Sequence, residues 1–170
     1  MTLVILFFAL SFAIEITQDI ISGGIGPTPR ESASIVFSSK NNLFYVFGGK
    51  STIDLDDLWV YDLTLLHWNI IYPNSQSPRK IYLESRSNAG GFYYDEEDEF
   101  CIYGGISELY LLNDLWCFNV EYRMWKEKKT EYSPPPMINF AHNYFVNNSS
   151  EYFVIVGYQI SGVMIDYLNT

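Results

Sequence analysis

The sequence predicts an all-β fold assembled from repeated units of four short antiparallel strands. Two observations predict it: one stretch occurs twice in the same order, and its residues are of strand-forming types. The stretch from Phe44 reads FYVFGG, then DDLWVYD, then a lone Trp68, and it returns from Phe100 as FCIYGG, NDLWCFN and Trp125. Corresponding residues stand about 57 positions apart, and self-similarity at such a period indicates one supersecondary unit used more than once.

Each element of the unit follows from its residue types. The run before the first glycine pair is aromatic and β-branched, which suits a pleated, half-buried surface. Gly48 and Gly49 end that strand, because glycine readily adopts the positive φ of a sharp exit. Leu58–Tyr61 is a second apolar run, and Trp68 marks a third. With Ser34–Phe37 ahead of them, the unit contains four short strands joined by turns.

The repeat also predicts pairings and burial. Residues 42–47 are expected to pair antiparallel with 58–62, and 99–103 with 115–119. The tryptophans of both units are expected to be buried, since 18% of the residues are aromatic and 48% are hydrophobic, enough for a sizeable core. We expect the repeat residues to build the fold; they are Gly48, Gly49, Asp57, Trp59, Tyr61, Trp68, Gly104, Gly105, Asp114, Trp116, Phe118 and Trp125.

Taken together, YVFGG, DLWVYD and the following tryptophan resemble the kelch repeat. Pro29-Arg30 is similar to the usual lead-in of that family, and Arg86 is its counterpart, because each arginine precedes the first glycine of its pair by 18 positions. The resemblance covers the chain from about Pro29 to its end. It implies a partial β-propeller of four-stranded kelch blades: about two full blades with partial blades on either side.

The resemblance also implies a function. Kelch blades commonly present loops to another protein, so the expected role is a non-catalytic interaction or scaffold module whose partner the sequence does not identify. The alternative is a secreted propeller related to galactose oxidase that acts on or binds carbohydrate. The paired histidine ligands of that copper enzyme have no counterpart here, so neither a cofactor nor an enzymatic activity is expected.

The repeats divide the chain into consecutive segments. Residues 14–29 are expected to hold the last strand of a preceding partial blade and a linker, 30–78 the first repeat, and 79–134 the second. Residues 135–170 read as a degraded, truncated third repeat, with Gly157 alone in place of the glycine pair and Asp166 as the counterpart of Asp57. Since a ring needs four to eight blades, we expect a fragment of a longer propeller, or a ring completed by a second chain.

Residues 1–13 contain a continuous apolar run. Its eleven residues, 3 to 13, are too few to span a bilayer, so no membrane span is expected. The run matches the core of a signal peptide, with Ser11-Phe12-Ala13 as a small-x-small cleavage site. The alternative is a buried strand of a preceding blade. A cleaved leader predicts the secretory pathway, and an uncleaved one predicts the cytoplasm.

Export would expose two further features to an oxidising compartment. Asn147 and Asn148 begin overlapping sequons in a polar turn, although such triplets are common by chance. Cys101 and Cys117 flank the hairpin of the second unit at equal distances from its centre, so they are expected to be cross-strand neighbours. A disulfide between them needs the closer, non-hydrogen-bonded type of pair.

Composition argues against several other classes of site. A net charge of −10 argues against binding to nucleic-acid phosphates. The acidic run 95–99 lacks the pattern of a calcium-binding loop and reads as a charged turn. His67 and His142 lie in different units, too few for a metal site. Some aromatic residues could line a sugar-binding surface, although packing between blades is favoured; they are Phe92, Tyr93, Tyr94, Tyr132 and Tyr144.

Overall fold

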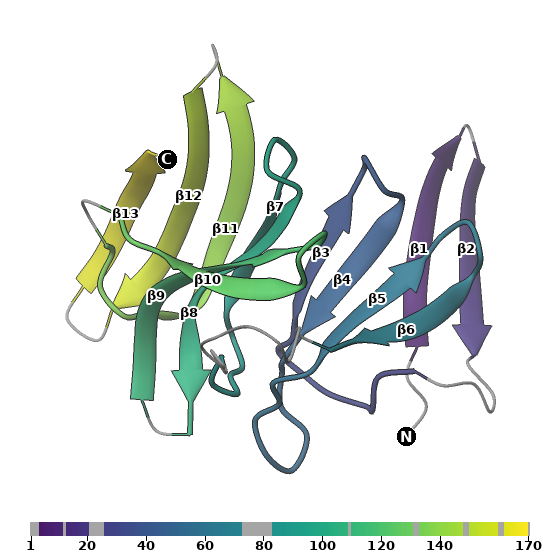
Figure 1. Ribbon diagram of the computed structural model, residues 1–170, viewed down its shortest axis with the longest axis horizontal. Helices are drawn as coiled ribbons and strands as arrows, with labels where there is room; N and C mark the ends of the chain where they lie inside the picture. Colours follow the sequence, from purple (N-terminus) through teal and green to yellow (C-terminus); the bar gives the residue numbers. More distant parts are fainter. Residues whose placement is uncertain are drawn as a thin grey trace.

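The computed structural model describes residues 4–11, 13–20, 26–72, 83–108, 110–130, 133–147, 150–159 and 162–169. Within these ranges the regular structure is all β, in four antiparallel sheets that stand side by side along the chain (Figure 1). Among the same residues, no helix has both the length and the apolar character needed to cross a membrane.

The first four-stranded sheet, which we call the first blade, follows the predicted order. Its strands pair in sequence: β3 (Ser34–Ser38), β4 (Leu43–Phe47), β5 (Leu58–Asp62) and β6 (His67–Ile71). The predicted pairing of the second and third strands is confirmed, with Val46 opposite Trp59.

The second blade repeats this meander with longer central strands. It contains β7 (Gly90–Tyr94), β8 (Glu99–Ser107), β9 (Tyr110–Asn119) and β10 (Met124–Lys128). Here β8 and β9 continue beyond the glycine pair, with a register shift between Tyr103 and Gly105. Cys101 lies opposite Cys117 with 4.0 Å between the Cα atoms, so the predicted register is confirmed, and the two sulfur atoms are bonded.

Two smaller sheets flank the blades. The N-terminal hairpin pairs β1 (Val4–Ser11) with β2 (Ala13–Ile20). Residues 4–11 of the expected leader therefore form a strand, which agrees with the alternative that this run is a strand of a preceding blade. Cleavage of the leader stays a prediction. The third blade contains β11 (Ile138–Asn147), β12 (Ser150–Gln159) and β13 (Gly162–Asn169).

The register of the third blade corrects one expectation. Val156, which precedes Gly157, pairs with Ile165, just as Phe47 pairs with Leu58 in the first blade. Met164 therefore occupies the register position of Asp57, and the assignment of Asp166 to that position was wrong by two residues. The spacing from Gly157 had assumed a connection as long as in the first blade, but the strands already pair at Gln159 and Gly162, only three positions apart in the chain.

Aromatic side chains fill the space between consecutive blades, as expected. Tyr45 stacks on Tyr93 and Phe100 of the second blade, with ring centroids 5.4 and 5.7 Å apart. Phe92 of the second blade packs on Phe153 of the third at 4.5 Å. The predicted burial of the tryptophans is confirmed: Trp68 and Trp125 are 8% and 6% exposed, Trp59 is 7% exposed, and Trp116 is half-buried.

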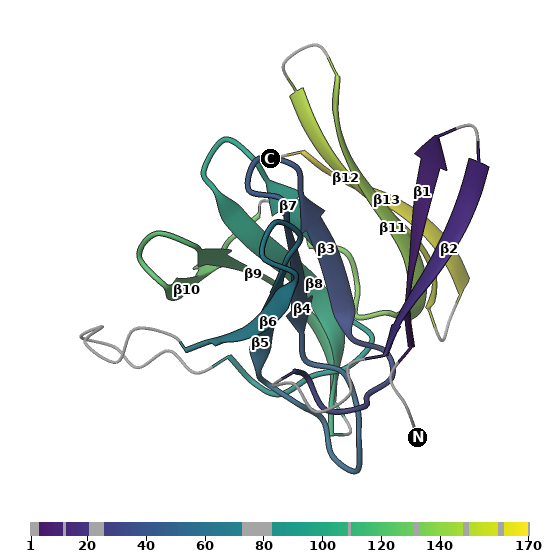
Figure 2. The same ribbon diagram turned by 90° about the vertical axis from the view of Figure 1, so that its right-hand side faces the viewer.

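The first strand of each blade lies at the inside of the assembly. β7 packs between β3 and β11, and both views show the three strands close together (Figures 1 and 2). The glycines at the start of β7 permit this approach. A Cβ on Gly90 would lie 2.5 Å from a ring carbon of Phe140, and one on Gly91 would lie 2.7 Å from Val36.

Candidate functional site

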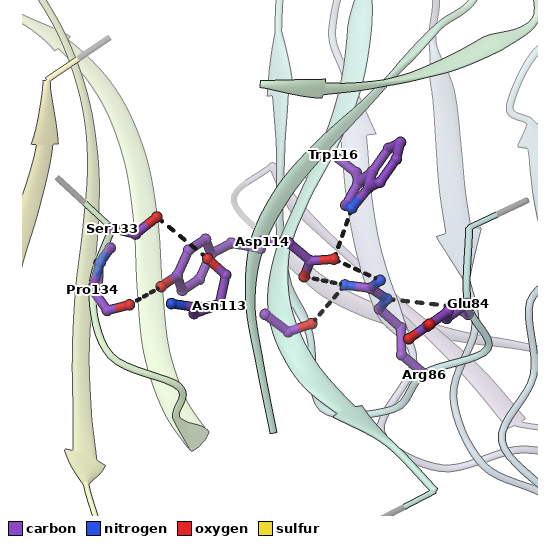
Figure 3. Close-up of polar contacts among 9 residues, drawn as sticks. Glu84, Arg86, Asn113, Asp114, Trp116, Ser133 and Pro134 are labelled. Carbon is purple, nitrogen blue, oxygen red and sulfur yellow. Dashed lines mark hydrogen bonds and ion pairs between the residues drawn. The ribbon is translucent and has the colours of Figure 1, made fainter. Parts of the chain in front are cut away.

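The repeat residues of the second blade meet in one hydrogen-bonded network (Figure 3). Arg86 holds Asp114 with two bonds, Nη1 to Oδ1 at 2.7 Å and Nη2 to Oδ2 at 3.0 Å. Its Nη1 also donates to the carbonyl oxygen of Gly104 at 3.1 Å. Trp116 donates its indole Nε1–H to Asp114 Oδ2 at 2.7 Å. The guanidinium thus joins the chain before the first strand to the glycine turn and to the third strand.

The first blade builds the same network from equivalent residues. Arg30 bonds both carboxylate oxygens of Asp57 and donates to the carbonyl of Gly48 at 2.9 Å. Trp59 Nε1 donates to Asp57 Oδ2 at 2.7 Å. Burial alone would raise the pKa of Asp57, but the hydrogen bonds from Arg30 and Trp59 outweigh it and hold that pKa below its usual value. The sequence count that paired Arg30 with Arg86 thus corresponds to a real equivalence.

These networks hold the fold together and also join the blades. The backbone of Arg86 accepts a hydrogen bond from Gly49 N at 2.9 Å and donates one to Leu55 O at 3.0 Å. Gly48 has a φ of 63°, and a Cβ there would lie 2.4 Å from the carbonyl oxygen of Arg86, so glycine is required on both grounds. The arginine, aspartate, glycine and tryptophan of each network are therefore brought together as structural groups, whereas Trp68 and Trp125 lie outside the networks and pack on aromatic side chains.

The third blade has an apolar residue at the position of the arginine, and the sequence repeat did not identify which one. Ala141 pairs with Val156 as Ser34 pairs with Phe47, so Ala141 is the counterpart of Ser34. Met137 precedes Ala141 by four residues, just as Arg30 precedes Ser34, and Met137 is therefore the counterpart of Arg30. Met137 is 1% exposed and packs within the apolar cluster between the second and third blades. Loss of the arginine here accompanies the loss of aspartate at the position of Met164.

Acidic side chains make further contacts between and within blades. Asp54, in the loop after β4, accepts hydrogen bonds from Ser87 Oγ at 2.9 Å and Glu108 N at 3.0 Å, both in the second blade. Asp98 accepts from Tyr93 Oη at 2.5 Å and from Asn41 Nδ2 at 3.0 Å. Burial would raise the pKa of Asp98, but these hydrogen bonds lower it overall.

Two further carboxylates of the acidic turn pair with one lysine. Lys128 bridges Glu97 and Glu99 at 2.7 and 2.9 Å. Glu99, Cys101 and Cys117 place possible ligand atoms within 4.8 Å of one another, the one such group among the described residues. Because the two sulfur atoms are bonded to each other, they do not offer the thiolates that a soft metal binds.

The other candidate residues are dispersed. His67 lies exposed on β6, 2.7 Å from the Asn69 amide nitrogen. His142 Nε2, on β11, accepts the N–H of Gly91 at 3.1 Å. The residue is exposed overall, but partial desolvation of its ring lowers the pKa of His142. Asn147 is exposed at the end of β11. Asn148 and Tyr132 lie outside the described residues.

The aromatic residues considered for sugar binding are largely part of the packing. Phe92 and Tyr93 are each 5% exposed, and Phe92 stacks on Tyr144 with centroids 5.1 Å apart. Tyr94 and Tyr144 are half-buried, and both pack against the cluster between the second and third blades. Their contacts therefore agree with packing between blades, the role favoured from the sequence.

One groove is lined by residues from all three blades. This groove of about 350 Å³ lies over the inner strands β3, β7 and β11. The lining residues that bear on its chemistry are Ile35, Phe37, Gly91, Asp95, His142 and Asn143. No spacing in the sequence could have found this groove, since its residues belong to three different repeats and are joined only by the packing of the blades.

Comparison with known proteins is consistent with this architecture. The KLHDC2/KLHL20/DRC7 kelch-repeats domain family matches residues 7–169. The chain is 33% identical over 139 residues to host cell factor homolog hcf-1 of Caenorhabditis elegans, covering 72% of this chain and 17% of that protein. It is 27% identical over 124 residues to host cell factor 1 of Homo sapiens and of Rattus norvegicus, covering 62% of this chain and 6% of theirs. The chain thus spans a small part of the length of these relatives.

Proposed function

Because this chain belongs to the kelch-repeat domains of the KLHDC2/KLHL20/DRC7 family, we propose that it is a non-catalytic module that binds another protein. The observation that carries the proposal is the use of the repeat residues. Arg30, Asp57 and Trp59 bond one another, as their counterparts in the second blade do, so the motif itself builds the fold. Recognition is then left to the loops, which differ from blade to blade, and to the groove that the three blades share.

The aromatic residues considered for the carbohydrate alternative give it little support. A sugar site of the kind considered needs exposed aromatic faces, whereas Phe92 and Tyr93 are buried between blades. The two histidines lie on different blades, each beside its own neighbour. These observations favour protein binding over carbohydrate chemistry.

Site-specific photocrosslinking tests the proposal. A benzophenone amino acid is placed at Ser51, exposed in the loop after β4, and in a second variant at Lys126, exposed on the outer strand β10. In cells that make the protein, Ser51 is expected to crosslink a discrete protein that Lys126 does not capture. Equal capture at both positions, or capture at neither, would contradict a loop-mediated partner.

Two observations bear on location. The disulfide between Cys101 and Cys117 supports the proposal that the chain is exported, because such bonds persist in oxidising compartments. The pairing of β1 with β2, together with a family match that begins at residue 7, supports retention of residues 1–13 and the cytoplasmic alternative.

A prediction separates these alternatives. Export predicts a mass that lacks the leader, no titratable thiol in the denatured, unreduced protein, and a glycan at Asn147 or Asn148. Retention in the cytoplasm predicts an intact N-terminus and two titratable thiols, since that compartment keeps thiols reduced. Intact-mass measurement and a thiol count on protein from its own cells decide between the two.

A further inference from the structure

The groove is lined by strand edges as well as by side chains. β3, β7 and β11 each lie at one end of the strand order of their sheet, so one edge of each has no strand partner among the described residues. At one point this edge is already used, because the N–H of Gly91 is met by the His142 ring. Edges without a strand partner can offer backbone donors and acceptors to an extended segment of another protein.

The side chains of the groove combine an apolar surface with one negative charge. Ile35 is 64% exposed and Phe37 is 44% exposed, although both are large apolar residues on a central strand of the assembly. Asp95, which is exposed, is the one acidic residue of the lining, and neither lysine nor arginine is among the lining residues. Asn143 contributes an exposed amide at the far side, on β11.

We propose that this groove binds an arginine side chain from an extended segment of the partner protein. Asp95 receives the guanidinium through paired hydrogen bonds, and the ring of Phe37 faces its plane. The aliphatic stem lies along Ile35, and the amide oxygen of Asn143 accepts a remaining N–H. This inference rests on the proposed function and names the chemistry of the partner at one position.

Charge complementarity favours this occupant over others. A carboxylate or phosphate would face Asp95 in a protein whose net charge is −10. A purely apolar side chain would leave that carboxylate without a partner at the edge of the contact. Arginine satisfies the acid and covers the apolar surface with the same side chain.

Binding of a minimal probe tests the inference directly. N-acetyl-L-arginine amide is titrated into the full, isotope-labelled chain, and backbone amide shifts are followed by NMR, with N-acetyl-L-citrulline amide as the neutral probe of similar shape. We expect saturable shifts at Ile35, Phe37, Asp95 and Asn143, and an affinity for the citrulline probe about tenfold lower, because a charge-assisted pair is lost.

Two matched variants locate the interaction. Asp95→Asn is expected to bring the arginine probe to the affinity of the citrulline probe. Glu96→Gln removes a charge from the next residue, which is exposed and does not line the groove, and should leave both affinities unchanged. Equal binding of the two probes, equal effects of the two variants, or no shift at the groove at millimolar probe would each overturn the proposal.

The outcome is separable from that of the proposed function. A partner captured at Ser51 together with a groove that ignores arginine would leave protein binding intact and remove only the arginine site. Arginine binding that depends on Asp95, with no partner captured, would leave the site intact and count against the loop-mediated function.

Discussion

At the residue scale, the buried guanidinium of Arg86 does most to define the second blade. It is 1% exposed, heads the fully buried side chains by volume in the part of the chain that the structure describes, and bonds Asp114 and the carbonyl of Gly104. A buried charge is tolerated here because an opposite charge and a backbone oxygen surround it. Removal of the arginine alone leaves the Asp114 carboxylate without a charged partner, with the indole N–H of Trp116 still bonded to it.

Arg86→Ala is expected to lower the free energy of unfolding by about 3 kcal/mol, the lower end for a broken buried pair, because Asp114 keeps some contact with solvent. Urea unfolding measures the change. Lys126→Ala, at an exposed position on β10, is the control and should stay within about 0.5 kcal/mol of the unchanged protein. If Arg86→Ala lowered the free energy of unfolding no more than Lys126→Ala does, the arginine network would be dispensable for stability.

The first blade predicts a pH dependence. The pKa of Asp57 is lowered in the folded chain, so its stabilisation is complete above the unfolded pKa of about 3.9 and is lost as pH falls through the lower folded pKa. Asp57→Asn should therefore flatten the loss of stability as the pH falls below about 4. Asp56→Asn, at the exposed neighbouring position, should keep the steep loss. Urea midpoints at several pH values provide the comparison, and identical slopes for both variants would refute the assignment.

At the scale of elements, the fourth strand of each blade is attached through one tryptophan. Trp68 on β6 lies opposite Tyr61, with ring centroids 5.0 Å apart, and Trp125 on β10 lies opposite Phe118 at 5.2 Å. Both strands are at the outer edge of their sheets, where ladder bonds exist on one side only. The tryptophan therefore supplies much of the packing that holds the strand in place.

Trp68→Ala is expected to destabilise the chain by about 3–5 kcal/mol, through lost burial and the cavity that remains. Thermal unfolding, followed by circular dichroism, measures the shift. Asn69→Ala changes the exposed neighbour on the same strand and should have little effect. An unchanged unfolding temperature for the tryptophan variant would mean that β6 is held by its backbone alone.

The elements were predictable because their signals are local. Gly48 ends β4 for a conformational reason visible in the sequence, and equal counting around the hairpin centre placed Cys101 opposite Cys117. The groove and the hydrogen bonds of Asp54 to the second blade were not predictable, because they depend on how one blade packs against the next. The register of the third blade was misjudged because loop length, unlike strand pattern, varies between repeats.

At the scale of the whole molecule, the third blade presents a face that no described blade covers. Phe145 is 42% exposed and stacks on Tyr152 at 5.3 Å, and Val156 is 44% exposed. Val156 pairs with Ile165 as Tyr103 pairs with Leu115, and Tyr103 is packed against the third blade. This face of the third blade thus corresponds to the face of the second blade that the third blade covers.

The matching face predicts how the isolated chain behaves. Contiguous apolar surface of this kind promotes association, so the chain alone should form concentration-dependent oligomers unless further blades, from a longer chain or a second one, cover it. Val156→Lys places a charge on that face and should shift sedimentation-velocity profiles towards the monomer. Ile53→Lys adds the same charge at a residue that is 68% exposed in the loop after β4, and should leave the profile unchanged. A wild-type chain that stays monomeric at high concentration, or equal effects of both lysines, would show that the face of the third blade needs no partner.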